Sequence, residues 1–143
     1  MLGRLLPALM PSWRFFDAIG PSPRVDYAWA DDDTLPRGWH EFRPRPTHLG
    51  VARMTARLFW NPRCNETLYI VRSAERVVEG DTDFPVRELR WRLLLAHRRG
   101  ELVTQTAPAL RFRVRAVYRE GEALVDEVVF VSGAFAADES ATR

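Results

Sequence analysis

This 143-residue sequence contains one cysteine and no lysine. The one cysteine, Cys64, excludes an internal disulfide and any zinc site built from several cysteines. There is no lysine, so every one of the 21 Lys+Arg positions is arginine, and isoleucine occurs only at Ile19 and Ile70. This bias is typical of a very GC-rich genome. No apolar run approaches the roughly 20 residues that cross a bilayer, so we expect no transmembrane helix.

The remaining composition is that of a folded protein. The length suits one compact domain, which buries about two-thirds of its unfolded surface. An apolar fraction of 46%, with five Trp and eight Phe, argues against disorder over most of the chain. The net charge is only +2, and nucleic-acid binders usually concentrate positive charge much more heavily. Nucleic acid is therefore a disfavoured partner.

Residues 1–23 differ from the rest of the chain and predict an N-terminal amphipathic docking segment. Leucines recur there at helical spacing, and Ser12 is a good N-cap for a second short helical turn. Ala28 and Ala30, on either side of Trp29, resemble the small residues of a signal-peptide cleavage site. They lie too far from an apolar stretch that Pro7 and Pro11 interrupt, so we reject a signal peptide. The large apolar side chains of the segment are Leu2, Leu5, Leu6, Leu9, Trp13, Phe15 and Phe16.

The apolar period changes to two after residue 23. Val25, Tyr27 and Trp29 alternate with Asp26 and Ala28, which predicts a strand with one buried face. A turn is expected at 31–36, with a returning strand over 38–43. The pattern over 51–60 fits a helix and a strand almost equally, and we favour a strand.

Two amphipathic helices are predicted next, joined by a short acidic loop. The first spans 62–79, since Asn61 and Pro62 favour a helix start and Gly80 favours its end. The second spans 85–99, between a cap at Asp83 and a stop at Gly100. The core face expected of the first helix is Cys64, Thr67, Leu68, Val71, Ala74 and Val78. The core stripe expected of the second is Val86, Leu89, Leu93 and Ala96.

The last third of the chain predicts a β-hairpin. Apolar residues alternate from Leu110 to Tyr118, the turn is at 120–122, and a second strand returns over 124–132. Residues 133–143 are expected to be a flexible tail. Strands, two helices and strands predict a single α+β domain over residues 24–132. Its antiparallel sheet would carry the helical hairpin on one face.

No motif in the sequence identifies a reaction. Cys64 opens a helix, but on its apolar face a free cysteine behaves as a small hydrophobe. His40, Glu41 and His48 are the one cluster of metal-ligand types, and they lie at a proline-rich connection without a second ligand pair. We predict no catalytic residue, no metal and no cofactor. An enzyme whose carboxylates follow no motif stays open.

A row of arginines on the hairpin is the candidate anion site. Arg111, Arg113 and Arg115 share one strand face at a spacing of about 7 Å, which can track phosphates. The returning strand offers Asp126 and Glu127, and cross-strand pairs between arginine and carboxylate are the simpler interpretation. If the row is open, anionic lipid headgroups suit it better than nucleic acid.

The sequence favours a non-catalytic accessory protein that docks on a membrane-associated protein complex from the cytoplasmic side. The N-terminal apolar residues suit a membrane interface or a hydrophobic clamp on another protein, or they fold back over the sheet. Trp91 and Leu95 join this docking set because they lie away from the core stripe of their helix. The alternatives are a small enzyme or ligand-binding domain, and binding of anionic lipid or nucleic acid through the arginine row.

Overall fold

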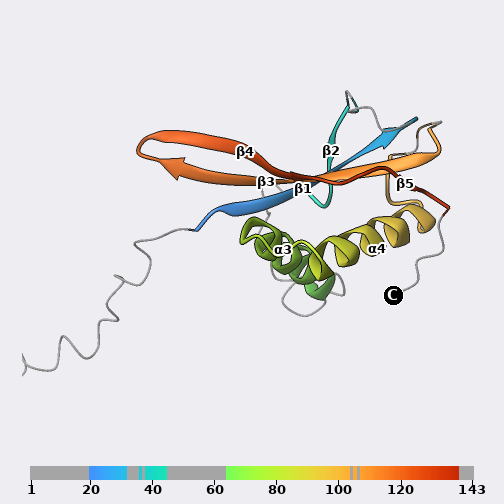
Figure 1. Ribbon diagram of the computed structural model, residues 1–143, viewed down its shortest axis with the longest axis horizontal. Helices are drawn as coiled ribbons and strands as arrows, with labels where there is room; N and C mark the ends of the chain where they lie inside the picture. The colour runs from blue at the N-terminus through green and yellow to red at the C-terminus, as the bar shows by residue number, and fades with distance from the viewer. Residues whose placement is uncertain are drawn as a thin grey trace, which may run out of the picture.

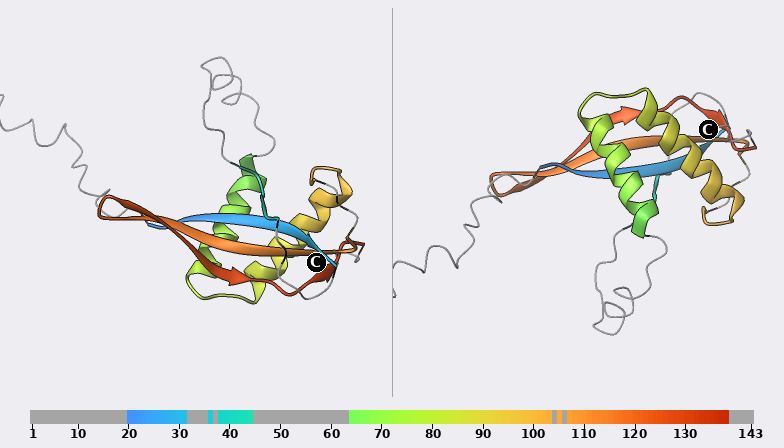
Figure 2. Two further views of the ribbon diagram at one scale, coloured as in Figure 1. Left: turned by 90° about the horizontal axis from the view of Figure 1, so that it is seen from above. Right: turned by 90° about the horizontal axis from the view of Figure 1, so that it is seen from below.

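A computed structural model describes residues 20–31, 36, 38–44, 64–103, 105 and 107–138. It shows a five-stranded antiparallel sheet in the order β2-β1-β3-β4, with β5 also paired to β3. Two helices, α3 and α4, pack on one face of this sheet (Figure 1). The views from above and below show both helices on the same side (Figure 2). The predicted α+β class is therefore confirmed.

β1 (Ser22–Ala30) and β3 (Ala109–Glu120) form the centre of the sheet and pair along the whole of β1. Their alternating side chains make the half of the core that faces the helices. The buried pairs across the two strands are Val25 with Val114, Tyr27 with Phe112, and Trp29 with Leu110. The alternation expected from the sequence is confirmed on this face. On the opposite face Asp26 is also buried, which the period-two pattern did not predict.

α3 (Cys64–Val78) and α4 (Phe84–Arg98) lie close to the predicted ranges. Each is followed by a glycine with positive φ, +96° at Gly80 and +67° at Gly100. The amides of these glycines donate to carbonyls in the last helical turn, at 3.1 and 2.9 Å, which terminates the helices as expected. The predicted cap differs in detail. Asp83 precedes α4, but its side chain makes no capping hydrogen bond because its backbone is already helical.

The buried face of α3 overlaps the predicted one and is rotated from it. Ala74, expected in the core, is buried against the sheet together with Ile70 and Val77, whereas Leu68, also expected in the core, is 55% exposed. Thr67, also expected on the core face, is exposed too. Helix α3 carries large apolar side chains on two adjoining faces, and periodicity alone does not say which of them meets the sheet.

The segment after α4 is held by two aromatic residues of β1. The indole N–H of Trp29 donates to the carbonyl of Val103 at 2.6 Å, and the amide of Val103 donates to the Tyr27 hydroxyl at 2.9 Å. The Trp29 ring also contacts the edge of His97 in the last turn of α4. Two core aromatics thus bury their rings and satisfy their polar tips on one loop. The predicted stripe of α4 is confirmed as buried at Leu89, Leu93 and Ala96.

β4 (Ala123–Val131) returns along β3 after a turn at Gly121, whose φ is +61°. The predicted hairpin and its turn are confirmed. The register shifts once, between Val114 and Arg115 of β3. The tip of this hairpin extends beyond α3, and most of β4 is exposed (Figure 1).

The end of the domain corrects the expectation of a flexible tail from residue 133. β5 (Phe135–Ala136) pairs with Ala109 and Leu110 of β3, beyond the point where β4 stops pairing with that strand. The Phe135 ring is buried, with its centroid 6.3 Å from that of Phe112. The folded domain therefore runs on through Ala137, because this aromatic ring completes the core at that end of the sheet.

β2 (His40–Glu41) is shorter than the strand expected over 38–43 and pairs with Asp26 and Tyr27. The domain also begins earlier than residue 24, since β1 starts at Ser22. The predicted N-terminal segment up to residue 19, the strand favoured over 51–60 and His48 lie outside the described residues.

Candidate docking surface

A second face of α3 lines a groove between the two helices. Its large side chains are left in solvent, with Leu68 55% and Tyr69 60% exposed. Because the spacing is helical, these residues form one continuous wall about three turns long. The α3 residues of this wall are Asn65, Leu68, Tyr69, Arg72, Ser73 and Arg76.

The first turn of α4 supplies the facing wall. Phe84 opens that helix just before Pro85, and its ring is 53% exposed. Glu88, one turn later, lines the same hollow. The groove encloses about 660 Å³, a volume within the range of known binding sites.

Each exposed aromatic ring of the groove lies against an arginine. The Arg92 guanidinium carbon is 5.0 Å from the Tyr69 ring centroid, and that of Arg76 is 5.7 Å from the Phe84 centroid. A cation at this distance is attracted to the ring face by about 0.5–2 kcal/mol. Both rings are thus held in place although more than half of their surface faces water.

The cations that hold the rings are themselves neutralised. Arg92 is buried and donates to one carboxylate oxygen of Glu88, from Nε at 2.8 Å and from Nη2 at 2.7 Å. Arg76 pairs with Asp81 in the loop between the helices. The groove therefore has apolar walls above a buried ion pair.

Arg72 is the exception among the charged groups of the groove. It lies in the middle of the α3 wall and is exposed. No carboxylate among the described residues lies within ion-pair distance of its guanidinium. One unneutralised positive charge thus remains beside the apolar surface.

Of the docking residues predicted from the sequence, only Trp91 and Leu95 belong to the part of the chain that the structure describes. Leu2, Leu5, Leu6, Leu9, Trp13, Phe15 and Phe16 lie outside the described residues. Trp91 and Leu95 are half-buried on α4, and neither lines the groove.

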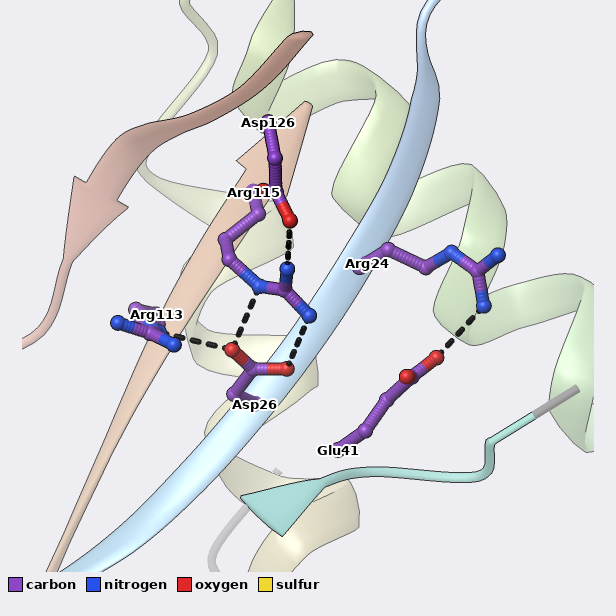
Figure 3. A network of polar contacts seen from close by, with 6 residues as sticks. All are labelled: Arg24, Asp26, Glu41, Arg113, Arg115 and Asp126. Atoms are coloured by element: carbon purple, nitrogen blue, oxygen red, sulfur yellow. Dashed lines mark hydrogen bonds and ion pairs between the residues drawn. The ribbon is translucent and has the colours of Figure 1, made fainter. Parts of the chain in front are cut away.

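The predicted arginine row lies on the sheet face opposite the helices and surrounds a buried carboxylate. Asp26, 2% exposed, accepts hydrogen bonds from Nε of Arg113 at 2.7 Å and from Nε and Nη2 of Arg115 at 2.7 and 3.0 Å. Arg115 also donates to Asp126 on β4 (Figure 3). The hydrogen bond to Asp26 raises the pKa of Arg115 above its ordinary value, burial opposes this, and the charges of Asp26, Asp126 and Glu41 add to it.

Three further contacts on this face also engage arginines. Arg113 stacks on Trp39, 4.6 Å from its ring centroid, and Arg24 pairs with Glu41 at 2.6 Å (Figure 3). Arg111 is buried and donates to the carbonyl of Ser132 at 3.0 Å. A phosphate arriving at Arg111, Arg113 and Arg115 would have to displace acceptors that belong to this chain.

The large apolar side chains that line the groove are visible in the sequence. Helical periodicity alone does not distinguish them from side chains of the core. Tyr69 and Phe84 carry the most exposed aromatic rings of the described residues, and neither stood out on a helical wheel. Tyr69 is next to Leu68, so the two predict a broad apolar face. The exposed position of Phe84 depends on how α4 packs beside α3, which the sequence does not show.

The described residues contain no group of three His, Cys, Asp or Glu side chains that could hold a metal ion. None of the described helices has the length and apolar character of a membrane span.

The comparisons with known proteins add no relative. No protein-family model, no curated protein and no solved structure matches this chain.

Proposed function

We propose that this protein is a non-catalytic accessory protein that docks on a membrane-associated protein complex, with the α3–α4 groove as a contact surface. One observation carries the proposal: Leu68, Tyr69 and Phe84 expose more than half of their surface around a single hollow. Contiguous apolar surface with a charged rim is typical of interaction sites on soluble domains. The arginines that hold the two rings reduce the ordering that binding would otherwise require.

The N-terminal residues 2–16 supply the second attachment in this proposal. Their leucines and aromatics, together with Arg4 and Arg14, have the composition of a helix in a membrane interface. The described residues share one apolar core that runs from Val25 to Ala137. The domain therefore has a core of its own, which supports a docking role for residues 2–16. The complex would then be bound at its cytoplasmic side, with this protein peripheral on the inner membrane.

A membrane co-sedimentation experiment tests the proposal with three proteins. The full chain should sediment with native membranes, and a chain lacking residues 2–16 and a Phe84→Ser variant should both lose at least tenfold in binding. Each buried aromatic or leucine side chain contributes roughly 1.5–3 kcal/mol, so either change is large enough to detect. Leu124→Ser is the matched control, since Leu124 is 71% exposed on β4 and outside the groove.

Two further measurements decide what the membranes supply. Protein-free vesicles of anionic lipid should bind the full chain weakly, and protease treatment of native membranes should abolish binding of the full chain. Strong binding to bare vesicles would replace the protein complex with a lipid surface. A melting temperature that falls by many degrees on removal of residues 2–16 would show that the segment covers the sheet instead. A full chain that ignores native membranes would end the proposal.

A further inference from the structure

We infer that the α3–α4 groove takes an amphipathic helix of a partner protein that carries an acidic residue facing Arg72. The inference rests on the proposed function and names the chemistry of the partner. Its first basis is length. The α3 wall runs from Asn65 to Arg76, and at a rise of about 1.5 Å per residue this is about three turns of helix. A partner helix of similar length would lie along the wall and place its apolar side chains against Leu68, Tyr69 and Phe84.

The second basis is the backbone of the groove. Both walls are helices, and beyond their first turns the backbone N–H and C=O groups are paired within α3 and α4. An extended peptide in this groove would therefore find no strand edge to pair with, and those of its amides that are buried against the walls would be left unsatisfied. A helical partner satisfies its own backbone and needs only side-chain contacts. The groove thus selects a helix over a strand.

The third basis is charge. Arg92 and Arg76 are neutralised by Glu88 and Asp81, whereas Arg72 is exposed beside the apolar wall and makes no ion pair with a carboxylate of the described residues. A carboxylate on the partner would meet this guanidinium at the edge of a desolvated contact, where a charged hydrogen bond is strong. The N-terminal segment of this same chain matches less well, because residues 1–23 contain two arginines, Arg4 and Arg14, and a single acidic residue, Asp17.

A peptide-display selection on the full chain tests the inference. The probe is a library of helix-favouring peptides about four turns long, randomised at the positions of one face and its flanks. We expect enriched peptides to carry apolar residues at i, i+3 or i+4 and i+7, with Asp or Glu beside them. Their affinity should fall at least tenfold on Arg72→Glu and on Phe84→Ser. The affinity should be unchanged by Arg119→Glu, which reverses the charge of an exposed side chain on β3 outside the groove.

Two outcomes separate this inference from the function on which it rests. Peptides that need Phe84 but bind Arg72→Glu as well as the native chain, or that tolerate a central proline, overturn the acidic helix and leave the groove as a docking surface. Peptides that ignore Phe84→Ser, or a selection that enriches nothing, overturn the groove itself and with it the proposed function. A synthetic peptide of residues 1–16 that binds the groove would replace the partner helix with this chain's own segment.

Discussion

The α3–α4 groove and the opposite face of the sheet both depend on arginine, and they use it in opposite ways. On the sheet, Arg113 and Arg115 surround Asp26 and leave it 2% exposed. In the groove, arginines support aromatic rings that stay more than half exposed. On the sheet, the arginines use their hydrogen-bond donors on acceptors of the same chain. In the groove, the arginines leave the apolar rings exposed to a partner. Arginine count alone therefore says little about where a partner binds.

The largest effect expected from this contrast is at Asp26. Asp26→Ala should lower the free energy of unfolding by about 3 kcal/mol, because it leaves two guanidinium groups without their shared acceptor. This is the lower end of the range for a broken buried pair, since the arginine side chains keep 18–25% exposure. The melting temperature should fall by roughly 10 °C. Thermal and urea unfolding measure it.

A variant of the same shape sharpens the Asp26 test. Asp26→Asn retains one acceptor oxygen, so it should lose less stability than Asp26→Ala. Equal stability of all three proteins would contradict a structural role for the network and would return the arginine row to consideration as an anion site.

The two arginines around Asp26 should differ in their effect. Arg115 makes two hydrogen bonds to Asp26 and one to Asp126, whereas Arg113 makes one to Asp26 and stacks on Trp39. We expect Arg115→Met to cost about 2 kcal/mol and Arg113→Met about 1 kcal/mol. The Asp26→Ala/Arg115→Met double variant should be more stable than the sum of the single losses predicts. Additive losses in urea unfolding would show that the two groups do not interact.

The groove variants should show the reverse behaviour. Tyr69→Ser and Phe84→Ser remove rings that are mostly exposed, so each should cost about 1 kcal/mol of stability or less, mainly the lost contact with its arginine. Binding of a groove-selected peptide should fall at least tenfold in the same variants. The two readouts are a urea melt and a titration with the peptide. Large loss of stability without loss of binding would make these rings part of the core.

The smallest expected effect is a loss of stability at alkaline pH, caused by ionisation of Tyr118 in the β3–β4 hairpin. The pKa of Tyr118 is raised above its ordinary value by desolvation and by the nearby charges of Glu127 and Glu120. A raised pKa favours the neutral phenol in the folded state. Its contribution to stability is therefore complete below a pH of about 10 and is lost as the pH rises through the raised pKa. Arg115, with its own pKa raised, stays charged throughout.

A comparison of unfolding curves above and below that pH measures this effect. Tyr118→Phe should remove the slope and leave the neutral-pH stability nearly unchanged. A native chain whose stability does not fall with rising pH would contradict the raised pKa.

Much of the fold could be predicted because local signals agreed with it. The glycines at 80, 100 and 121 end two helices and form one hairpin turn, as their positions in the pattern indicated. The alternation of Val25, Tyr27 and Trp29 gave the buried face of β1. Phe135 was missed because a two-residue strand is too short to show a period, and its place beside Phe112 depends on where β4 ends.

The candidate site was predicted less well, for a different reason. Leu68 and Tyr69 are neighbours on α3, and their spacing from the other apolar residues fits a core face as well as an exposed one. Only the packing of α3 through Ile70, Ala74 and Val77 decides that the first pair is left outside. Likewise, nothing in the sequence near Asp26 shows that Arg113 and Arg115 lie beside it on the neighbouring strand.

The sequence by itself determined the α+β class, both helices, the hairpin and the two helix-stopping glycines, because each depends on spacing and backbone preferences within one segment. Only the tertiary structure decided which apolar face of α3 meets the sheet, that Asp26 is buried under two arginines, and that Phe84 and Tyr69 line one groove. These features depend on register between strands and on how the two helices pack beside each other. Both are set by contacts between distant segments, where burial of the whole core outweighs the preference of any single stretch.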